Sequence, residues 1–148
     1  MASRLYEKIL IATDGSEYTK NAVDYGIDLA KNTGAKLLTI YVVDTAAFAS
    51  IPMDAAWESM YELLKQEGDA AIKYVADKAK AEGLEVEGNL IEGHPADEII
   101  KYSEKNSVSL IIMGTLGKSG LDRFLLGSVA EKVVRNSKIP VLVVHTKK

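Results

Sequence analysis

Short apolar runs alternate along the chain with longer stretches in which apolar residues recur every three or four positions. The first run, residues 9–12 (ILIA), is apolar at every position and stops at Thr13, Asp14 and Gly15. A strand that is apolar on both faces is typical of a parallel sheet buried between helices. We therefore expect a strand here, followed by a helix that Ser16 caps and that Gly34 ends.

The same alternation continues to the end of the sequence. Further strands are predicted at residues 37–43, 86–91, 110–113 and 141–144. Between them we expect a loop at 45–56, a long helix whose apolar stripe runs from Trp57 to Ala79 and packs in the core, a helix that starts at Pro95, and a helix at 128–137. This order of strands and helices predicts an α/β fold, with a parallel sheet covered by helices on both faces.

Composition limits the kinds of protein this chain can be. Its 148 residues fit one domain, so we expect a single domain over 1–148. A net charge of −3 gives little support for binding nucleic acid, and the absence of cysteine excludes disulfides, Cys-ligated zinc and thiol nucleophiles. No apolar run approaches the ~18 residues of a membrane span. We expect a cytoplasmic protein that binds neither membrane nor nucleic acid.

Four glycines lie between the predicted fourth strand and the helix after it, in GTLGKSGLDRFLLGS (114–128). Glycine lets backbone amides approach a ligand, and free amides at a helix start form an anion site, with phosphate as the obvious anion. Lys118 and Arg123 add positive charge. The stretch is neither a P-loop nor G-x-G-x-x-G. A purely structural reading stays open, in which Ser128 and Glu131 form a capping box and the glycines only make turns.

The spacing of these glycines carries a specific resemblance. Gly114-x-x-Gly117, then nine residues, then Gly127-Ser128 resembles the G-2x-G-9x-G-[S/T] motif of the ATP-binding universal stress protein family. The flanks KILIATDGSEYTKNAVDYGIDLA and GSVAEKVVRNSKIPVLVV are similar as well, so the resemblance covers essentially the whole chain. It implies a five-stranded parallel sheet ordered 3-2-1-4-5, with ATP in the crevice between the first and fourth strands.

The resemblance also implies which residues surround the nucleotide. The adenosine would lie beside Ala12, Thr13 and Asp14, with adenine contacted by the backbone of Val42. The ribose and phosphates would lie over Met113 and Gly114, and the phosphates, with Mg²⁺ or Mn²⁺, would be held by Gly117, Gly127, Ser128 and Val129. Ala12 departs from the family pattern, where proline or valine is common, but it removes no polar contact.

Three functions remain open on this basis. The first is an ATP-binding regulatory or stress-response protein. The second is a slow or partner-dependent ATPase or phosphotransferase, for which Asp14 is the only convincing base. This side chain could also bond a ribose hydroxyl or help to place Mg²⁺, and its position after a buried strand favours such a role over that of a turn residue. The third is a scaffold that uses no nucleotide. Family members commonly dimerise through the last strand, so we expect a homodimer through 141–144.

Overall fold

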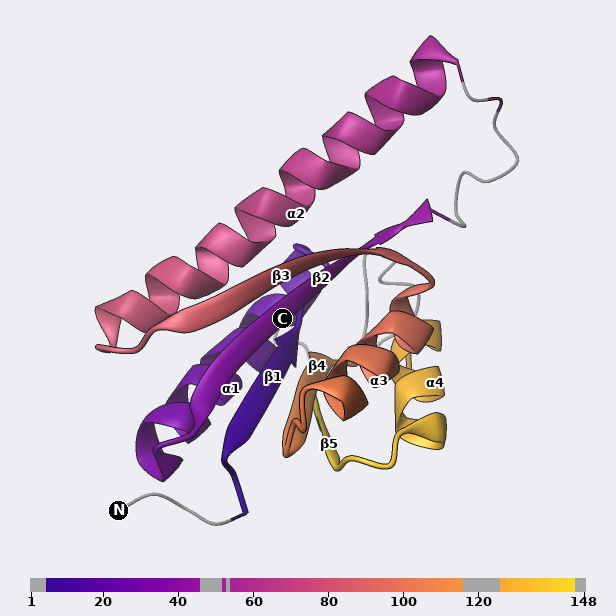
Figure 1. The fold of residues 1–148 in the computed structure, drawn as a ribbon. Coiled ribbons are helices and arrows are strands. Elements are labelled where there is room, and N and C mark those ends of the chain that lie inside the picture. Colours follow the sequence, from indigo (N-terminus) through magenta and orange to yellow (C-terminus); the bar gives the residue numbers. More distant parts are fainter. Residues whose placement is uncertain (1–4, 46–51, 53, 116–125, 146–148) are drawn as a thin grey trace.

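Five parallel strands form one sheet in the computed structural model, which describes residues 5–45, 52, 54–115 and 126–145 (Figure 1). The strands are β1 (Lys8–Ala12), β2 (Lys36–Asp44), β3 (Val86–Gly93), β4 (Leu110–Gly114) and β5 (Val141–Val144). Their order across the sheet is β3-β2-β1-β4-β5, and every neighbouring pair is parallel. The predicted fold class and strand order are therefore confirmed.

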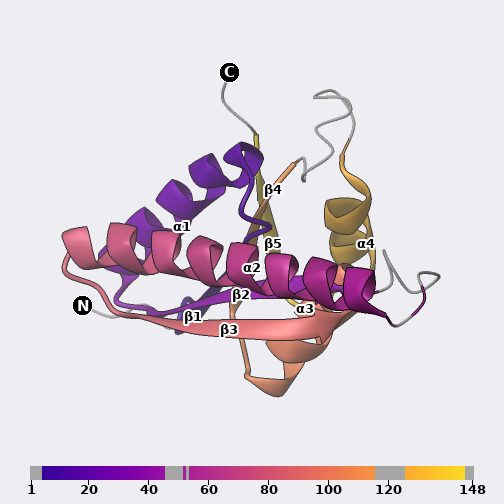
Figure 2. The same ribbon diagram turned by 90° about the horizontal axis from the view of Figure 1, so that it is seen from above.

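Helices cover both faces of this sheet. On one face lie α1 (Lys20–Thr33) and α2 (Ala55–Ala81), and on the other lie α3 (Pro95–Lys105) and α4 (Ser128–Asn136) (Figure 1). Seen from above, α2 extends along β2 and β3 (Figure 2). Since successive strand residues point to opposite faces, the fully apolar β1 contributes to both cores: Ile9 and Ile11 pack toward α1, and Leu10 toward α3 and α4.

The region between β1 and α1 differs from the prediction. Ser16 does not cap α1, because a 3-10 turn, η1 (Glu17–Thr19), comes first and α1 begins only at Lys20. The Ser16 backbone amide and hydroxyl donate instead to Asp14 Oδ1, at 2.9 and 2.6 Å. The predicted end of α1 is confirmed: Gly34 adopts the left-handed conformation, with φ of 77°, and its amide donates to the carbonyl of Ala30.

Helix α2 begins two residues before the predicted stripe, and only its second half is buried. The carboxylate of Asp54 accepts hydrogen bonds from the amides of Ala56 and Trp57, which starts the helix inside the predicted loop. The buried positions of α2 are Gly68, Ala71, Val75 and Ala79. The expectation that the whole stripe packs in the core is therefore only partly confirmed: Met60 is 41% exposed, whereas Tyr61 and Leu64 are partly buried against a core cluster that contains Tyr41.

Gly68 marks a close approach of α2 to the sheet. A Cβ placed on this residue would lie 2.5 Å from Leu90 Cδ1 and 2.7 Å from Tyr41 Cδ1. Glycine therefore allows the helix to pack directly on the Tyr41 ring, which is 2% exposed. This contact fixes the position of one wall of the cavity described below. Among the described residues, no helix is both long enough and apolar enough to cross a bilayer.

Candidate functional site

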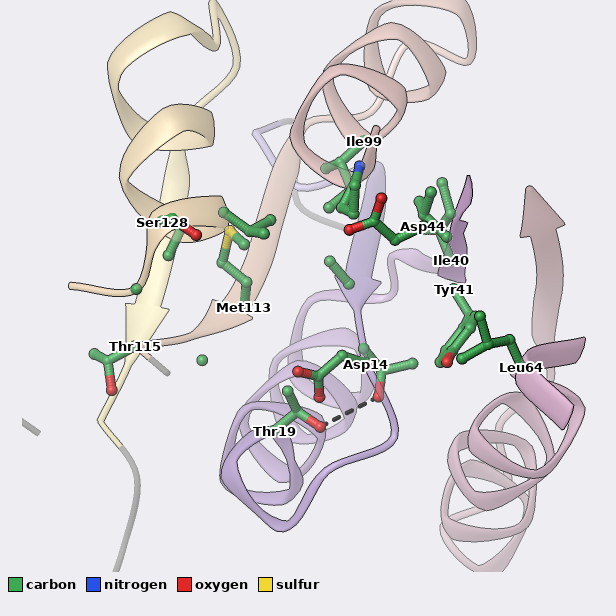
Figure 3. Close-up of a pocket in the computed structure, with 18 residues that line it drawn as sticks. Asp14, Thr19, Ile40, Tyr41, Asp44, Leu64, Ile99, Met113, Thr115 and Ser128 are labelled. Atoms are coloured by element: carbon green, nitrogen blue, oxygen red, sulfur yellow. Dashed lines mark hydrogen bonds between the residues drawn. The ribbon is translucent and has the colours of Figure 1, made fainter. Parts of the chain in front are cut away.

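A cavity of about 360 Å³ opens beyond the carboxyl ends of β1, β2 and β4 (Figure 3). Nine of the ten predicted site residues line it: Ala12, Thr13, Asp14, Val42, Met113, Gly114, Gly127, Ser128 and Val129. The tenth, Gly117, lies outside the described residues. We call this hollow the main cavity.

The strand order explains why these distant residues meet. β1 pairs with β4 in register, with Ile11 opposite Ile112, so the chain leaves both strands at the same edge of the sheet. β1 also pairs with β2 on its other side. The connections from β1 and β4 lead away in opposite directions, which leaves a crevice at this point of a doubly wound sheet. Asp14 follows β1 and Gly114 ends β4, so both reach the crevice.

The start of α4 presents backbone donors to the main cavity. Gly127 is the N-cap, with extended backbone angles of −62° and 155°, and Ser128 is the first helical residue. The first hydrogen bond of the helix type runs from the amide of Glu131 to the carbonyl of Gly127. The amides of Ser128, Val129 and Ala130 precede it and so have no partner within the helix. Together with the positive end of the helix dipole they form an anion site on the cavity wall.

The predicted capping box is wrong. Ser128 is not the N-cap, because the helix begins one residue earlier than that motif requires and Gly127 takes the N-cap position. The Glu131 carboxylate instead accepts a hydrogen bond of 2.6 Å from Arg135. The Ser128 hydroxyl is therefore not used to cap α4, and it lies on the cavity wall (Figure 3).

Two other amides near the glycine stretch are used by the fold itself. The amide of Thr115 donates to the carbonyl of Val144, at 3.1 Å, and the amide of Gly127 donates to the carbonyl of Thr115, at 2.7 Å. These donors are not available to a ligand. What Gly127 offers the cavity is the absence of a side chain beside the amides of α4.

The loop after β1 holds Asp14 in one orientation. Asp14 Oδ1 accepts both hydrogen bonds from Ser16, so the role of a turn residue is fulfilled by that oxygen. The amide of Gly15 donates to the Thr13 hydroxyl, which lies 3.2 Å from the Thr19 hydroxyl (Figure 3). Asp14 Oδ2 accepts no hydrogen bond from the described residues, and this half-buried carboxylate lines the cavity.

Sequence reasoning missed the apolar side of the cavity. It is formed by residues of β2, α2 and α3. Four of them are labelled in Figure 3, namely Ile40, Tyr41, Leu64 and Ile99, and the fifth is Pro95. Leu64 belongs to the stripe that the sequence assigned to core packing, and Pro95 was noticed only as a helix start. Further lining residues are Thr19, Asp44, Thr115 and Ala130. Of these, only Asp44 had a visible signal, because it directly follows an apolar strand.

The described wall carries negative but no positive side chains. Asp14 and Asp44 are its only charged residues among those the structure describes, and Lys118 and Arg123 lie outside that part of the chain. The same described part holds no cluster of three or more His, Asp or Glu side chains that could bind a metal ion. Any positive charge on the described wall therefore comes from the start of α4.

The tyrosines with shifted pKa values lie off this wall. Burial is the main cause that raises the pKa of Tyr102, which packs between α3 and the sheet. The Tyr61 hydroxyl donates to Glu92, and this hydrogen bond raises the pKa of Tyr61. Both groups stabilise the packing of helices on β3, and neither is placed to transfer a proton to a ligand in the main cavity.

Comparison with known proteins agrees with this geometry. The model of the universal stress protein family matches residues 5–145. A universal stress protein of Methanocaldococcus jannaschii is 46% identical over 144 residues, which cover 97% of this chain and 85% of the relative. UspA from Lactobacillus plantarum superposes with a TM-score of 0.85 at 22% identity, covering 94% of this chain and 97% of its own, and shows the shared fold.

A further solved structure adds a ligand. It is a universal stress protein in complex with cAMP, and it superposes with a TM-score of 0.70 at 29% identity, covering 96% of this chain and 98% of its own. The family model and the Methanocaldococcus relative each match nearly the whole sequence. This chain therefore belongs to the universal stress protein family.

Proposed function

We propose that this universal stress protein binds ATP in the main cavity and acts as a nucleotide-dependent regulatory module in a stress response. One observation carries the proposal. The first amides of α4 face the same cavity whose other side is built from apolar side chains, so one hollow offers an anion site and a surface for a planar base. The cAMP complex of a family member supports an adenine nucleotide as the ligand.

In this proposal the nucleotide extends from the apolar side of the cavity to α4. Adenine lies among Ile40, Tyr41 and Leu64, and its edge is read by the backbone of Val42. The ribose lies near Asp14 and Met113. The phosphates lie over Gly114 and against the amides of 128–130, with Gly117 contributing from outside the described residues.

A divalent ion fits this arrangement without a dedicated protein site. Mg²⁺ usually keeps several waters and binds through substrate phosphates and one or two carboxylates. On the described wall, Asp14 Oδ2 and the Ser128 hydroxyl are oxygen ligands that the fold does not consume. Because this wall carries no cationic side chain, Mg²⁺ or Mn²⁺ would also offset the charge of the triphosphate.

The same residues favour a regulator over an efficient enzyme. Phosphoryl transfer needs a positioned base or acceptor and several fixed cations. The described wall offers only two carboxylates, and one oxygen of Asp14 is already held by Ser16. We therefore expect hydrolysis by the isolated protein to be slow or to depend on a partner. Steady release of phosphate at several per second by purified protein would instead establish an ATPase.

We further propose that the protein is a homodimer through β5. This strand is at an edge of the sheet, with β4 on its other side. Leu142 is 36% exposed there, and Val134 of the neighbouring α4 is 46% exposed. An apolar edge strand of this kind favours pairing with another strand.

Calorimetry with ATP, ADP and AMP, each with and without Mg²⁺, tests the nucleotide proposal. We compare the parent with Gly127→Asp and Gly127→Asn, two side chains of nearly equal size. Any residue can adopt the φ of −62° at this position, so both variants should keep the fold. Asp places a carboxylate beside the phosphates and should weaken ATP binding by about 100-fold or more, whereas Asn should weaken it by about tenfold at most. A parent that binds no adenine nucleotide, or an Asp variant that equals the Asn variant, would contradict the proposal.

A further inference from the structure

A second cavity, of about 440 Å³, lies between α2 and the turn that leads into α1. One side is formed by Gly15, Ser16, Glu17 and Lys20, and the other by residues of α2 that include Glu67, Ala70 and Tyr74. Three residues, Thr13, Asp14 and Thr19, line both this cavity and the main one. The second cavity is thus next to the proposed nucleotide site but has its own opening between two helices.

The α2 side of this cavity continues as one face of the helix. Steps of three or four residues place the following side chains on that face: Ala56, Met60, Leu63, Glu67, Ala70, Tyr74 and Lys78. Its C-terminal part packs against α1. The Lys20 ammonium lies 5.3 Å from the centre of the Tyr74 ring, and the Lys78 ammonium lies 3.6 Å from Asp24. This part of the face has a helical neighbour.

The N-terminal part of the same face has no such neighbour among the described residues. α1 begins only at Lys20, while α2 continues for several turns beyond that level to Ala55 (Figure 1). Met60 is 41% exposed and Leu63 is 56% exposed. An apolar face that is covered by a helix in one half and open in the other has the form of a helix-binding groove.

The charges around the second cavity indicate the kind of partner. Asp14, Glu17 and Glu67 bring three carboxylates to its lining, and Lys20 brings the only ammonium there among the described residues. Lys20 donates to Glu17 at 2.8 Å, and this hydrogen bond raises the pKa of Lys20, so the two charges offset each other. Among the lining side chains that the structure describes, carboxylates thus outnumber ammonium groups by three to one, which favours a lysine or arginine side chain.

We propose that the second cavity and the open face at Met60 and Leu63 form one docking surface for a basic amphipathic helix of another protein. The apolar side chains of that helix pack on α2 in line with α1, and one of its basic side chains enters the second cavity beside Asp14 and Glu67. The mode is that of a helix in a groove, in which anchors recur every three or four residues.

A second copy of this chain fits the surface less well. The part of α2 that carries the open face also carries Asp54, Glu58, Glu62 and Glu67, against a single Lys65. Pairing this face with itself would bring like charges together, and the chain as a whole has a net charge of −3. A basic partner has no such repulsion.

The test uses two model peptides of about 15 residues with leucines at i, i+4, i+7 and i+11. Their remaining positions are mainly Lys and Ala in one peptide and mainly Glu and Ala in the other. Fluorescence anisotropy with the nucleotide-free protein should show that the Lys peptide binds at least about tenfold more tightly than the Glu peptide. Because no nucleotide is present, this measurement does not depend on the proposed ATP site.

Matched variants then locate the binding surface. Leu63→Ala should weaken the Lys peptide about fivefold or more, whereas Asp69→Asn, at an exposed position on another side of α2, should change its affinity less than about twofold. Glu67→Gln should reduce the preference for the Lys peptide. Equal binding of the two peptides, or equal affinity of the parent and Leu63→Ala, would overturn the proposal. Self-association that Leu63→Ala abolishes would overturn it in favour of a second copy.

Discussion

The backbone amide of Gly127 donates a hydrogen bond of 2.7 Å to the carbonyl of Thr115. This contact joins the residue after β4 to the N-cap of α4, although eleven positions separate them in the sequence. The amide of Thr115 is in turn bonded to Val144 of β5. The start of α4 is therefore held against the sheet by the protein itself, and its first amides are oriented before any ligand arrives.

A proline at position 128 tests whether a backbone amide holds the phosphate. Proline is well tolerated at the first position of a helix, and the extended backbone of Gly127 is compatible with it. Ser128→Pro removes the amide donor and the hydroxyl, whereas Ser128→Ala removes only the hydroxyl. By calorimetry we expect the proline variant to lose about 10- to 100-fold in ATP affinity and the alanine variant less than about tenfold.

Two results would contradict the proposal that a backbone amide at the start of α4 binds the phosphate. One is a proline variant that binds ATP as well as the alanine variant. The other is a loss of affinity in the proline variant that comes with a large fall in its melting temperature, since the proline would then have disturbed the helix rather than removed one donor.

Gly68→Ala should destabilise the protein, although alanine favours a helix by about 1 kcal/mol over glycine. The added methyl group would collide with the Tyr41 ring and Leu90, and overpacking of a core typically costs about 1–3 kcal/mol. We expect a net loss of about 1 kcal/mol in urea unfolding, and weaker ATP binding because Tyr41 lines the main cavity. In a Leu90→Ala background the same change should cost less. A stabilised single variant would show that α2 moves away freely.

Leu142→Lys should convert the proposed dimer to a monomer. It places a charge on the exposed face of an edge strand, which is a common way to prevent strand pairing. Light scattering at micromolar concentration should give the dimer mass for the parent and half of it for the variant. Tyr25→Lys, at a 52% exposed position on α1, should leave the dimer intact. A parent that is already monomeric would refute the dimer.

Tyr102 should make stability sensitive to alkaline pH. Its pKa is raised in the folded protein, mainly by burial, above an unfolded value of about 10. The folded state thus prefers the neutral phenol, and the corresponding stability is complete below about pH 10 and is lost as the pH rises through the folded pKa. The unfolding free energy of Tyr102→Phe should fall less steeply above about pH 10 than that of the parent. Parallel curves would contradict this assignment.

The order and kind of the elements could be predicted because the apolar runs of β1, β2 and β4 are buried on both faces and stand out from the helical periods between them. The four residues of 9–12 illustrate this: they face two cores, and no helical period fits them. The strand order did not follow from the same patterns. It came from the resemblance carried by the glycine spacing and was then confirmed by the sheet.

Two helix starts were misread for a common reason. Both Ser16 and Ser128 looked like caps, because a hydroxyl residue stands just before or at a helical pattern. In the structure Ser16 bonds to Asp14, and Gly127 takes the N-cap position before Ser128. A local motif does not say which of several nearby donors and acceptors will pair, because that depends on the backbone angles of the residues between them.

The apolar side of the main cavity could not be predicted from the sequence, for a different reason. Leu64 and Ile99 belong to helices that follow β2 and β3 in the chain, and their place at the cavity depends on how those helices pack on the sheet. Leu64 in particular repeats with the same period as the buried residues of α2. Periodicity identifies the face of a helix, but it does not tell a core contact from a cavity wall.

The shared lining of the two cavities has a thermodynamic consequence. Asp14 faces both hollows, and the Thr13 and Thr19 hydroxyls lie 3.2 Å apart between them. A ligand in one hollow that changes the charge or position of Asp14 alters affinity in the other, and linkage requires the effect to be equal in the reverse direction. The factor by which the bound Lys peptide changes the affinity for ATP should therefore equal the factor by which bound ATP changes the affinity for the Lys peptide. Titrations of ATP at a fixed peptide concentration, and of the peptide at a fixed ATP concentration, measure the two factors.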